Sequence, residues 1–370
     1  MRISNRLAVA LVLFASIAVS TGTLTFIATN MAMENAYRQY TKLLSSELES
    51  RRLRVQNYLT QVGYDLSITA NSRFAQHALI DFTDAFHQLG DDARDTLQKL
   101  YISGNPSPSG RKNLLMTAKD GSDYSNLHLE YHTWTNDIAK IRNYYDIFLV
   151  DTDGHIVYTV FKEDDFATNL NTGKYNKTEL ASIYKQVIED PVPGKIYAED
   201  FVLYAPSNNK PAAFMGTAVN YEGDFVGVVI IQLKPDPFND IMRYSSLLGD
   251  SGETIIVGSD KLLRSRSRFS EEETVLKTKV DTPSVKGALA GRSGIGVIND
   301  YRGIRVLSAY APIIGNRSTW AIITKIDVEE VETQPLVLMR WLILVSAIFS
   351  VLGFLLGWFL AGRDEADVQH

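Results

Sequence analysis

The sequence predicts an α+β protein with two tandem antiparallel sheet modules on a long N-terminal helix, flanked by two transmembrane helices. Three observations lead to this fold class. Apolar segments near both ends are long enough to cross a bilayer. A helix-like stretch without proline follows the first of them. After that stretch, a hairpin, a helix and three strands occur twice in succession.

The first apolar segment, residues 7–29, contains no charged side chain and can span a hydrocarbon core of about 30 Å as a helix. Arg2 and Arg6 precede it, and basic residues favour the cytoplasmic side. We therefore expect residues 1–6 in the cytoplasm. The alternative is a cleaved signal peptide, whose apolar part would be shorter.

The second apolar segment predicts a transmembrane helix at residues 335–362. Arg340 lies near its outer end, and Trp341 and Trp358 lie near its two ends, where interfacial side chains are common. Two spans would place both termini in the cytoplasm and the central part of the chain outside. Since only residues 363–370 would follow as a cytoplasmic tail, we expect a missing or separate signalling output.

Residues 30–105 are predicted to form a long helical stalk with apolar residues at seven-residue intervals. Two rows share this interval: Leu48, Val55 and Val62, and then Leu59 and Leu66. Such a seam can pack on the protein's own core or form the contact of a homodimer. The sequence leaves both possibilities open.

Residues 106–235 are predicted to form the membrane-distal module, which begins after a Pro/Gly/Ser-rich break. In "YYDIFLVDTDGHIVYTV" two strands flank a bend at residues 152–154, and Asp-Gly is a strong hairpin signal. A helix at "KTELASIYKQVI" precedes three more strands, with "NYEGD" as the last turn. This order predicts a PAS-like antiparallel sheet.

Residues 236–334 repeat the architecture as a membrane-proximal module. Two strands, "GETIIVGSD" and "LLRSRSRF", are expected to flank a turn. The helix "TPSVKGALAG" would have Thr282 as N-cap and Pro283 in its first turn. Three further strands complete a second PAS-like sheet.

Composition excludes several function classes. The net charge of −6 argues against a nucleic-acid partner, and a chain without cysteine has neither disulfides nor Cys-ligated zinc. Catalytic motifs of the G-x-S-x-G, H-E-x-x-H and P-loop types are missing, so we expect no enzyme and no cofactor. A non-sensing membrane anchor or assembly protein and, less favoured, a metal-dependent extracytoplasmic enzyme remain as alternatives.

The whole arrangement resembles a double Cache sensor, the extracytoplasmic input domain of bacterial chemoreceptors, histidine kinases and cyclases. The stretches that carry the resemblance are "YYDIFLVDTDGHIVYTVFKEDDFATNL", "YAPSNNKPAAFM", "GDSGETIIVGSDKLLRSRSRF" and "YRGIRVLSAYAPI". It implies a two-pass protein of the bacterial inner membrane with a periplasmic sensor. The ligand would be a small amino acid, organic acid or amine, bound in the distal module.

The implied pocket lies between the distal sheet and the preceding helix and loop. Alternate strand residues share a face, so one face of the hairpin would line the pocket and the other would be sheet core. The candidate ligand contacts on the strands are Tyr144, Asp146, Phe148, Tyr158, Lys162 and Tyr204, each of which could instead be core.

In amino-acid-binding members an Arg-x-Trp element holds the ligand carboxylate and two aspartates hold its ammonium group. The matching stretch here is "YHTWTND", in which Trp134 and Asp137 fit and Asp200 is a candidate for the later aspartate. His132 stands where arginine is expected, so Lys162 could supply the positive charge. We expect His132 to titrate near neutral pH, so that acid would tighten carboxylate binding.

Two further polar runs could be ordinary solvated or ion-paired segments, or they could form binding sites. "HLEYH" could offer His128, Glu130 and His132 to a metal, but such runs are usually solvated, and we expect no metal site there. "RSRSR" would place Arg264, Arg266 and Arg268 on one strand face. They could contact an anion or pair with the acids at residues 271–273.

Overall fold

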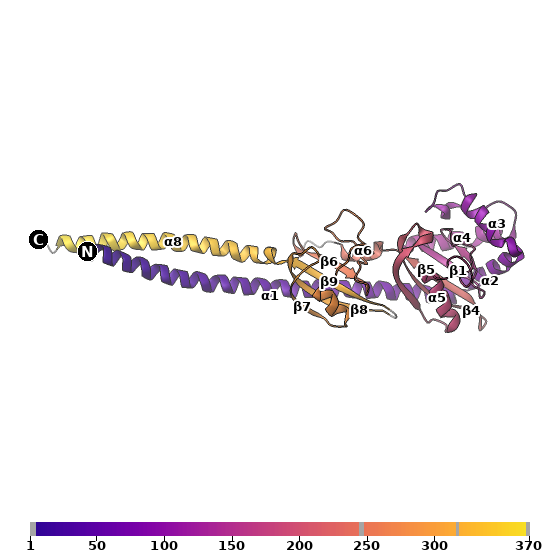
Figure 1. The fold of residues 1–370 in the computed structure, drawn as a ribbon, viewed down its shortest axis with the longest axis horizontal. Coiled ribbons are helices and arrows are strands. Elements are labelled where there is room, and N and C mark those ends of the chain that lie inside the picture. The colour runs from indigo at the N-terminus through magenta and orange to yellow at the C-terminus, as the bar shows by residue number, and fades with distance from the viewer. Residues whose placement is uncertain (1–4, 244–247, 316–317, 368–370) are drawn as a thin grey trace.

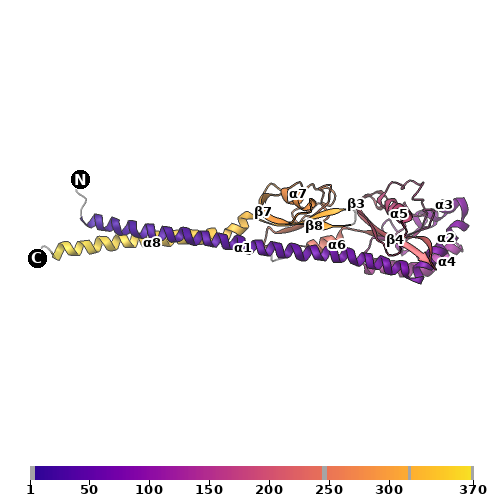
Figure 2. The same ribbon diagram turned by 90° about the horizontal axis from the view of Figure 1, so that it is seen from below.

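The protein is an elongated rod with two long helices at one end and two sheet modules in series at the other (Figure 1). The structure is a computed structural model that describes residues 5–243, 248–315 and 318–367. Helix α1 (Asn5–Asn71) extends from the N-terminal end along one side of both modules (Figure 2). The predicted α+β fold class is confirmed.

Helices α1 and α8 (Val328–Asp367) pack side by side, and each contains a stretch long and apolar enough to cross a membrane. Gly353 and Gly357 form a G-x-x-x-G pair at their contact. A Cβ atom on Gly357 would lie 2.9 Å from the Cα of Ala10, so only glycine permits this approach. Small residues at this spacing bring membrane helices close together.

The heptad seam of α1 packs on the protein's own core. Leu48, Val55, Val62 and Leu66 are buried in a cluster that continues into both sheet modules. The structure also divides the predicted 30–105 stalk, because α1 ends at Asn71. Ser72 then caps a new helix, α2 (Arg73–Gln88), through a 3.2 Å hydrogen bond from Ala75 N to its hydroxyl. A short helix α3 (Ala93–Gln98) follows.

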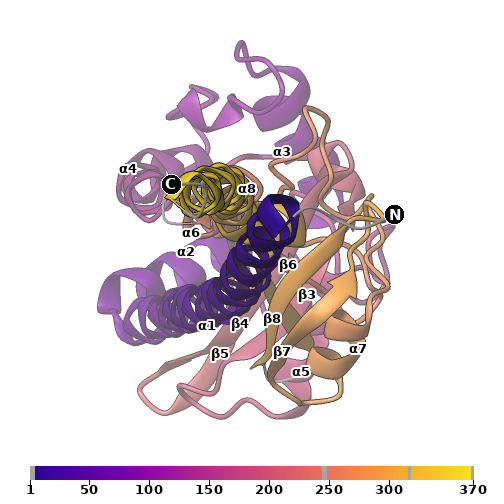
Figure 3. The same ribbon diagram turned by 90° about the vertical axis from the view of Figure 1, so that its left-hand side faces the viewer.

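The distal module has a five-stranded antiparallel sheet with strand order β2-β1-β5-β4-β3. The strands are β1 (Asp146–Val150), β2 (Ile156–Thr159), β3 (Tyr197–Tyr204), β4 (Lys210–Tyr221) and β5 (Asp224–Leu233). Helices α2 and α4 (Asp123–Ile141) lie on the opposite side of the sheet from α5 (Glu179–Glu189) (Figure 3). The predicted hairpin bend is confirmed, and Gly154 adopts φ +95° there.

The proximal module has a four-stranded sheet of order β6-β9-β8-β7. Its elements are α6 (Asp236–Met242), β6 (Glu253–Val257), α7 (Pro283–Leu289), β7 (Gly294–Asn299), β8 (Arg305–Ile314) and β9 (Thr319–Asp327). The predicted cap of α7 is confirmed, since the Thr282 side chain accepts from Val285 N.

The predicted strand "LLRSRSRF" is wrong. Residues 262–269 make only isolated bridges, because side chains accept from several of their backbone N–H groups. Arg266 N donates to Asn239 Oδ1 at 2.7 Å, and Arg268 N donates to Glu253 Oε1 at 3.1 Å. These donors are therefore not available to a neighbouring strand.

The last strand of the proximal sheet continues directly into the second apolar helix. β9 ends at Asp327 and α8 begins at Val328. The Glu330 carboxylate on the first turn of α8 accepts from Asp250 N at 2.8 Å. Further along, Tyr37 of α1 donates to Glu332 at 2.6 Å. The proximal sheet is thus joined without a loop to a helix that runs along α1 toward the end of the rod where the two apolar stretches lie.

Candidate ligand site in the distal module

The distal sheet and helices α2 and α4 enclose a small cavity where the resemblance implies a ligand. Its volume is about 10 Å³, which is room for about one water molecule. The lining is mainly aromatic and aliphatic: Thr69, Phe74, Ala75, Ala78, Phe82, Tyr131, Trp134, Thr135, Ile147, Leu149 and Tyr158. The structure therefore shows this site closed.

A row of buried polar groups borders the closed cavity. His132 Nε2 lies 2.8 Å from the Asn113 carbonyl, so this nitrogen carries the proton and Nδ1 accepts from the Tyr158 hydroxyl at 2.6 Å. The same hydroxyl lies 3.0 Å from Thr135 Oγ1. Burial lowers the pKa of His132 to about 3, so the ring is neutral at neutral pH. The expectation that His132 titrates near neutral pH is corrected for this closed form, because its site is desolvated.

His128 stacks on His132 with ring centroids 4.3 Å apart, since both lie one turn apart on α4. Its Nδ1 lies 2.7 Å from the Met116 carbonyl, whereas its buried Nε2 has no hydrogen-bond partner within the described residues. Glu130 is exposed on another face of α4. The "HLEYH" run therefore does not converge on a metal site.

Lys162 lies buried at the end of the hairpin, next to this row. Its backbone adopts φ +53°, which is uncommon for a residue other than glycine. The Nζ atom contacts the Thr159 carbonyl and lies 4.3 Å from the centre of the Tyr158 ring and 5.6 Å from that of Phe166. Burial lowers the pKa of the Lys162 ammonium. An aromatic cage thus holds a cation that has few polar contacts.

Asp146 is buried but directed toward the backbone rather than into the cavity. Its carboxylate accepts from Ile147 N and Val160 N, each at 2.7 Å, and from the Thr159 hydroxyl. Burial raises its pKa above the usual range of aspartate. These bonds fix the end of the hairpin from which Lys162 projects, so Asp146 positions the site without lining it.

The face alternation predicted for β1 holds within the strand. Ile147 and Leu149 line the cavity, whereas Phe148 belongs to the core on the α5 side. Tyr144 precedes the strand and instead donates to Asp65 of α1 at 2.5 Å. Phe148 and Tyr144 were both expected near the ligand, and the structure places neither on the cavity.

The other residues that were predicted to contact the ligand lie in different parts of the distal module. Trp134 lies half-buried on α4 with its ring 4.5 Å from that of Phe74, and it lines the cavity. Asp137, one turn further along α4, is exposed. Tyr204 packs in the α5-side core and donates to Asp165 at 2.6 Å. Of the predicted set, His132, Trp134, Tyr158 and Lys162 therefore come together.

Asp200 lies at the junction of the two modules rather than at the cavity. Its carboxylate binds the Arg264 guanidinium through two 2.9 Å hydrogen bonds and accepts from Trp320 Nε1 at 2.9 Å. The anion predicted for Arg264 is thus a carboxylate of the same chain. Arg266 pairs with Glu273 at 3.0 Å, and Arg268 donates to the Gly252 carbonyl at 2.6 Å. The three arginines do not form a common anion site.

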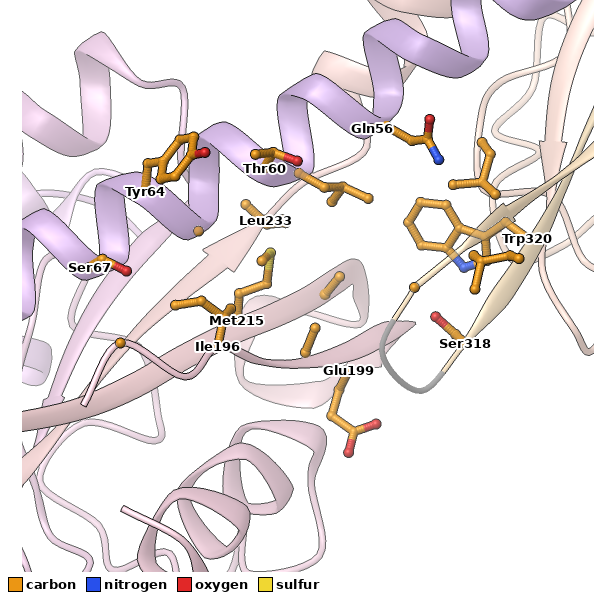
Figure 4. A pocket seen from close by; sticks show the side chains of 18 residues that line it. Gln56, Thr60, Tyr64, Ser67, Ile196, Glu199, Met215, Leu233, Ser318 and Trp320 are labelled. Atoms are coloured by element: carbon orange, nitrogen blue, oxygen red, sulfur yellow. The ribbon is translucent and has the colours of Figure 1, made fainter. Parts of the chain in front are cut away.

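A cavity of about 650 Å³ lies beside this junction, between α1, the β3–β4 side of the distal sheet and Trp320 (Figure 4). Met215 and Leu233 of the distal sheet face α1 residues such as Thr60 across it. Within the described residues, the two modules are therefore not packed tightly along their whole boundary. Space remains next to the ion pair that joins them.

Two groups that the sequence interpretation did not assign to the ligand site belong to the distal interior. Asp165 is buried, its Oδ1 has no partner in the described part of the chain, and burial raises its pKa well above that of free aspartate. His128 was considered only as a metal ligand. The only sequence signal at Asp165 is the acidic run "KEDD". Because a run of charges normally indicates a solvated loop, this signal predicts an exposed side chain and not a buried one.

Comparison with protein families matches residues 28–335 to the family described as Cache domain. The chain belongs to the Cache domain family. This match covers the long helix and both sheet modules, so the Cache assignment confirms the resemblance inferred from the sequence. Cache domains are extracytoplasmic sensor domains of membrane receptors, and the two apolar helices flank this one.

Solved structures similar to this Cache protein are sensor domains with low sequence identity. The ligand-binding domain of the Pseudomonas fluorescens chemoreceptor CtaA, in complex with L-serine, is 15% identical, with 75% of this chain and 98% of that chain covered and a TM-score of 0.37. The ligand-binding domain of the Campylobacter jejuni chemoreceptor Tlp3, in complex with L-valine, is 11% identical, with coverage of 81% and 98% and a TM-score of 0.47.

The sensor domain of the V. cholerae histidine kinase DctB is 10% identical, covers 77% of this Cache chain and 98% of its own, and has a TM-score of 0.44. A search of curated proteins gave no match.

Proposed function

We propose that this Cache protein is a transmembrane sensor that binds a small polar metabolite beneath α2 and α4 of the distal module. The observation that carries the proposal is the buried cluster of Lys162, His128, His132 and Tyr158 beside a closed aromatic cavity. A buried ammonium and an unpartnered ring nitrogen are unfavourable in a core that serves only packing. A ligand would donate to this ring nitrogen and would add a carboxylate to the contacts that Lys162 makes with the Thr159 carbonyl and the Asp146 charge.

The chemistry of these groups favours a ligand with a carboxylate next to a hydrogen-bond donor. Lys162 Nζ is a point charge that a carboxylate can approach, and such pairing would restore the lysine pKa that burial lowers. His128 donates from Nδ1 to Met116, so its Nε2 can accept from a ligand N–H or O–H. Amino acids and hydroxy acids combine both features. Trp134 would pack against the body of the ligand.

Ligand entry requires α2 and α4 to move away from the sheet, because the closed cavity has room for only about one water molecule. We expect an equilibrium between closed and open forms that the ligand shifts toward the open one. A change in the distal sheet would reach Asp200 on β3, then Trp320 on β9, and finally α8, which continues β9. The proximal module would transmit the signal.

In this proposal the protein crosses the bacterial inner membrane twice, with residues 1–6 and 363–370 in the cytoplasm. Two such chains would pair through the stalk as a homodimer. A missing or separate cytoplasmic part would produce the output.

The test is a thermal-shift screen of the full chain in lipid nanodiscs against amino acids, organic acids and amines. A ligand that binds the folded state raises the melting temperature by mass action. Lys162→Met keeps the length of the side chain and removes the charge, so affinity for a carboxylate should fall about ten- to a hundred-fold. Asp137→Ala, an exposed change on α4, serves as the matched control. Equal affinity in Lys162→Met and wild type would refute this site.

One observation favours a second function, that of a non-sensing membrane anchor. The cavity of about 10 Å³ leaves no room for a ligand in the closed form. An anchor would show no stabilisation by any compound, and Lys162→Met would then raise the melting temperature, because the cost of burying an ammonium group is removed. A sensor would lose ligand stabilisation in the same variant. The two functions therefore give different results in one experiment.

A further inference from the structure

Four metal-ligating side chains meet at the end of the distal module farthest from the paired apolar helices. His87 lies in the last turn of α2, and Asp151, Asp153 and His155 lie in the β1–β2 bend. Each offers one ligand atom, and these four atoms all lie within 4.8 Å of one another. Two histidines and two carboxylates from separate elements thus converge on one point.

Asp151 is the centre of this cluster. Its side chain is 1% exposed, and its Oδ1 accepts from Asp153 N at 3.0 Å and from His155 N at 2.8 Å. The other oxygen, Oδ2, lies 3.0 Å from His155 Nδ1 and 3.3 Å from His87 Nε2. One buried carboxylate oxygen is therefore aimed between two imidazole nitrogens.

We propose that His87, Asp151, Asp153 and His155 bind one divalent transition-metal ion of the Zn²⁺ type. Metal–ligand bonds of about 2.0–2.1 Å place tetrahedral ligand atoms roughly 3.3 Å apart. The distances of 3.0 and 3.3 Å around Asp151 Oδ2 already match this spacing. Asp153 Oδ2 lies 4.0 Å from His87 Nε2, so a shift of less than 1 Å would bring these two ligand atoms to the tetrahedral spacing.

The exposure of two of the ligands fits capture of an ion from solution. Asp151 is rigidly held, whereas the side chains of His87 and Asp153 are 47% and 68% exposed and can rotate onto an ion. The amides of Asn169 and Asn171 each donate to the Asp153 carbonyl at 3.0 Å and hold the bend in place. These contacts orient the ligands from outside the coordination sphere.

Ion access follows from the position of the cluster at the surface. His87 and His155 both line an open cavity of about 1190 Å³ between α2, α3 and residues 167–175. Basic and acidic side chains alternate around it: Asp91, Arg94, Asp95, Lys99, Asp164 and Lys174. A hydrated cation can therefore approach the two histidines without any opening of the fold.

The donor set selects the kind of ion. Imidazole nitrogens suit Zn²⁺, Ni²⁺ and Cu²⁺, whereas Ca²⁺ and Mg²⁺ prefer sites made of oxygen atoms. Bound metal would tie the last turn of α2 to the β1–β2 bend. Since Ala75, Ala78 and Phe82 of the same helix line the distal cavity, the ion would also restrain the helix that covers it.

The test uses the full chain in nanodiscs, purified without a histidine tag and stripped with EDTA. Titration with Zn²⁺ against a chromophoric chelator should give one site per chain, and Co²⁺ should give the absorption of a four-coordinate complex. His87→Gln and His155→Gln should each weaken binding at least about ten-fold, since even changes outside the coordination sphere weaken binding by 10–100-fold. A hundred-fold excess of Ca²⁺ should not compete.

His77→Gln is the matched control, because His77 is an exposed histidine about three turns earlier on α2. It should leave Zn²⁺ affinity unchanged. The His87 side chain is 47% exposed, so its substitution should leave the core intact, and the melting temperature of metal-free variants verifies this. Zn²⁺ binding that survives the double change His87→Gln/His155→Gln, or the lack of stoichiometric binding by the wild type, would overturn the proposal.

Discussion

The Arg264 guanidinium binds the Asp200 carboxylate through two hydrogen bonds of 2.9 Å and so joins the proximal module to the distal module. Arg264 is buried with 3% of its side chain exposed, and Asp260 lies 3.0 Å from its other terminal nitrogen. Trp320 donates to the same Asp200 carboxylate from β9. One aspartate on β3 thus contacts the strand that leads into α8.

Asp200→Asn should loosen this junction. The amide keeps the shape but loses the charge, and the loss of a charge-assisted hydrogen bond costs about 1.5–3 kcal/mol. We expect a lower melting temperature and faster proteolytic cleavage between the modules. Asp224→Asn, an exposed change at the start of β5, should alter neither. Identical proteolysis of the Asp200 variant and the wild type would show that the ion pair does not hold the modules together.

Acid should destabilise the distal module through His132. Burial lowers its folded-state pKa to about 3, whereas a histidine in the unfolded chain titrates near 6.5. Between these values the unfolded chain binds the extra proton, so the free energy of unfolding falls as pH falls below about 6.5. At pH 5 this histidine should account for about 2 kcal/mol of the loss.

His132→Gln should therefore reduce the change in the free energy of unfolding between pH 7 and pH 5. The substitution also removes hydrogen bonds, which lowers the free energy of unfolding at both pH values but not its slope. Denaturant unfolding at several pH values measures the slope. His77→Gln, on the exposed side of α2, should retain the slope of the wild type. Parallel curves for His132→Gln and wild type would mean that another group causes the acid sensitivity.

Much of the fold was predictable because its signals are local. Uncharged segments identified both apolar helices, and Asp153-Gly154 identified the hairpin bend. Thr282 before Pro283 identified the cap of α7. The strand expected at "RSRSR" failed for a non-local reason. Its backbone donors bind Asn239 and Glu253, which no pattern within the segment indicates.

The site was less predictable because its contacts are tertiary. Strand alternation indicated which side chains share a face, but not that Tyr144 would reach Asp65 on α1. Nor did it indicate that Asp200 would bind Arg264, 64 positions later. The run "DTDGH" carries three of the four side chains proposed for metal, yet the fourth, His87, comes from a helix distant in sequence.

If the protein forms a homodimer through its stalk, the contact lies on the exposed side of α1. Leu53 and Ile68 are apolar side chains left 45% and 67% exposed there, whereas Val55 and Val62 are buried in the chain's own core. The chain has no cysteine, so single cysteines can be introduced cleanly. Oxidation should crosslink chains carrying Leu53→Cys or Ile68→Cys and spare those carrying Val55→Cys or Val62→Cys. Lack of crosslinked dimers at every exposed stalk position would exclude this contact.

The close approach of α1 and α8 should depend on Gly357. A leucine there would collide with Ala10, because even its Cβ would lie 2.9 Å from the Ala10 Cα.

Nearer the sheet modules, the hydroxyls of Thr25 and Ser346 lie 3.2 Å apart, so cysteines at these two positions should form a disulfide within one chain on oxidation. Gly357→Leu should reduce the yield of this disulfide, because packing of small residues, rather than a hydrophobic force, holds helices together in lipid. Leu355→Val, a change on a side chain that is 56% exposed, should leave the yield unchanged. An equal yield in Gly357→Leu and in the parent would mean that the sheet modules alone align the two helices.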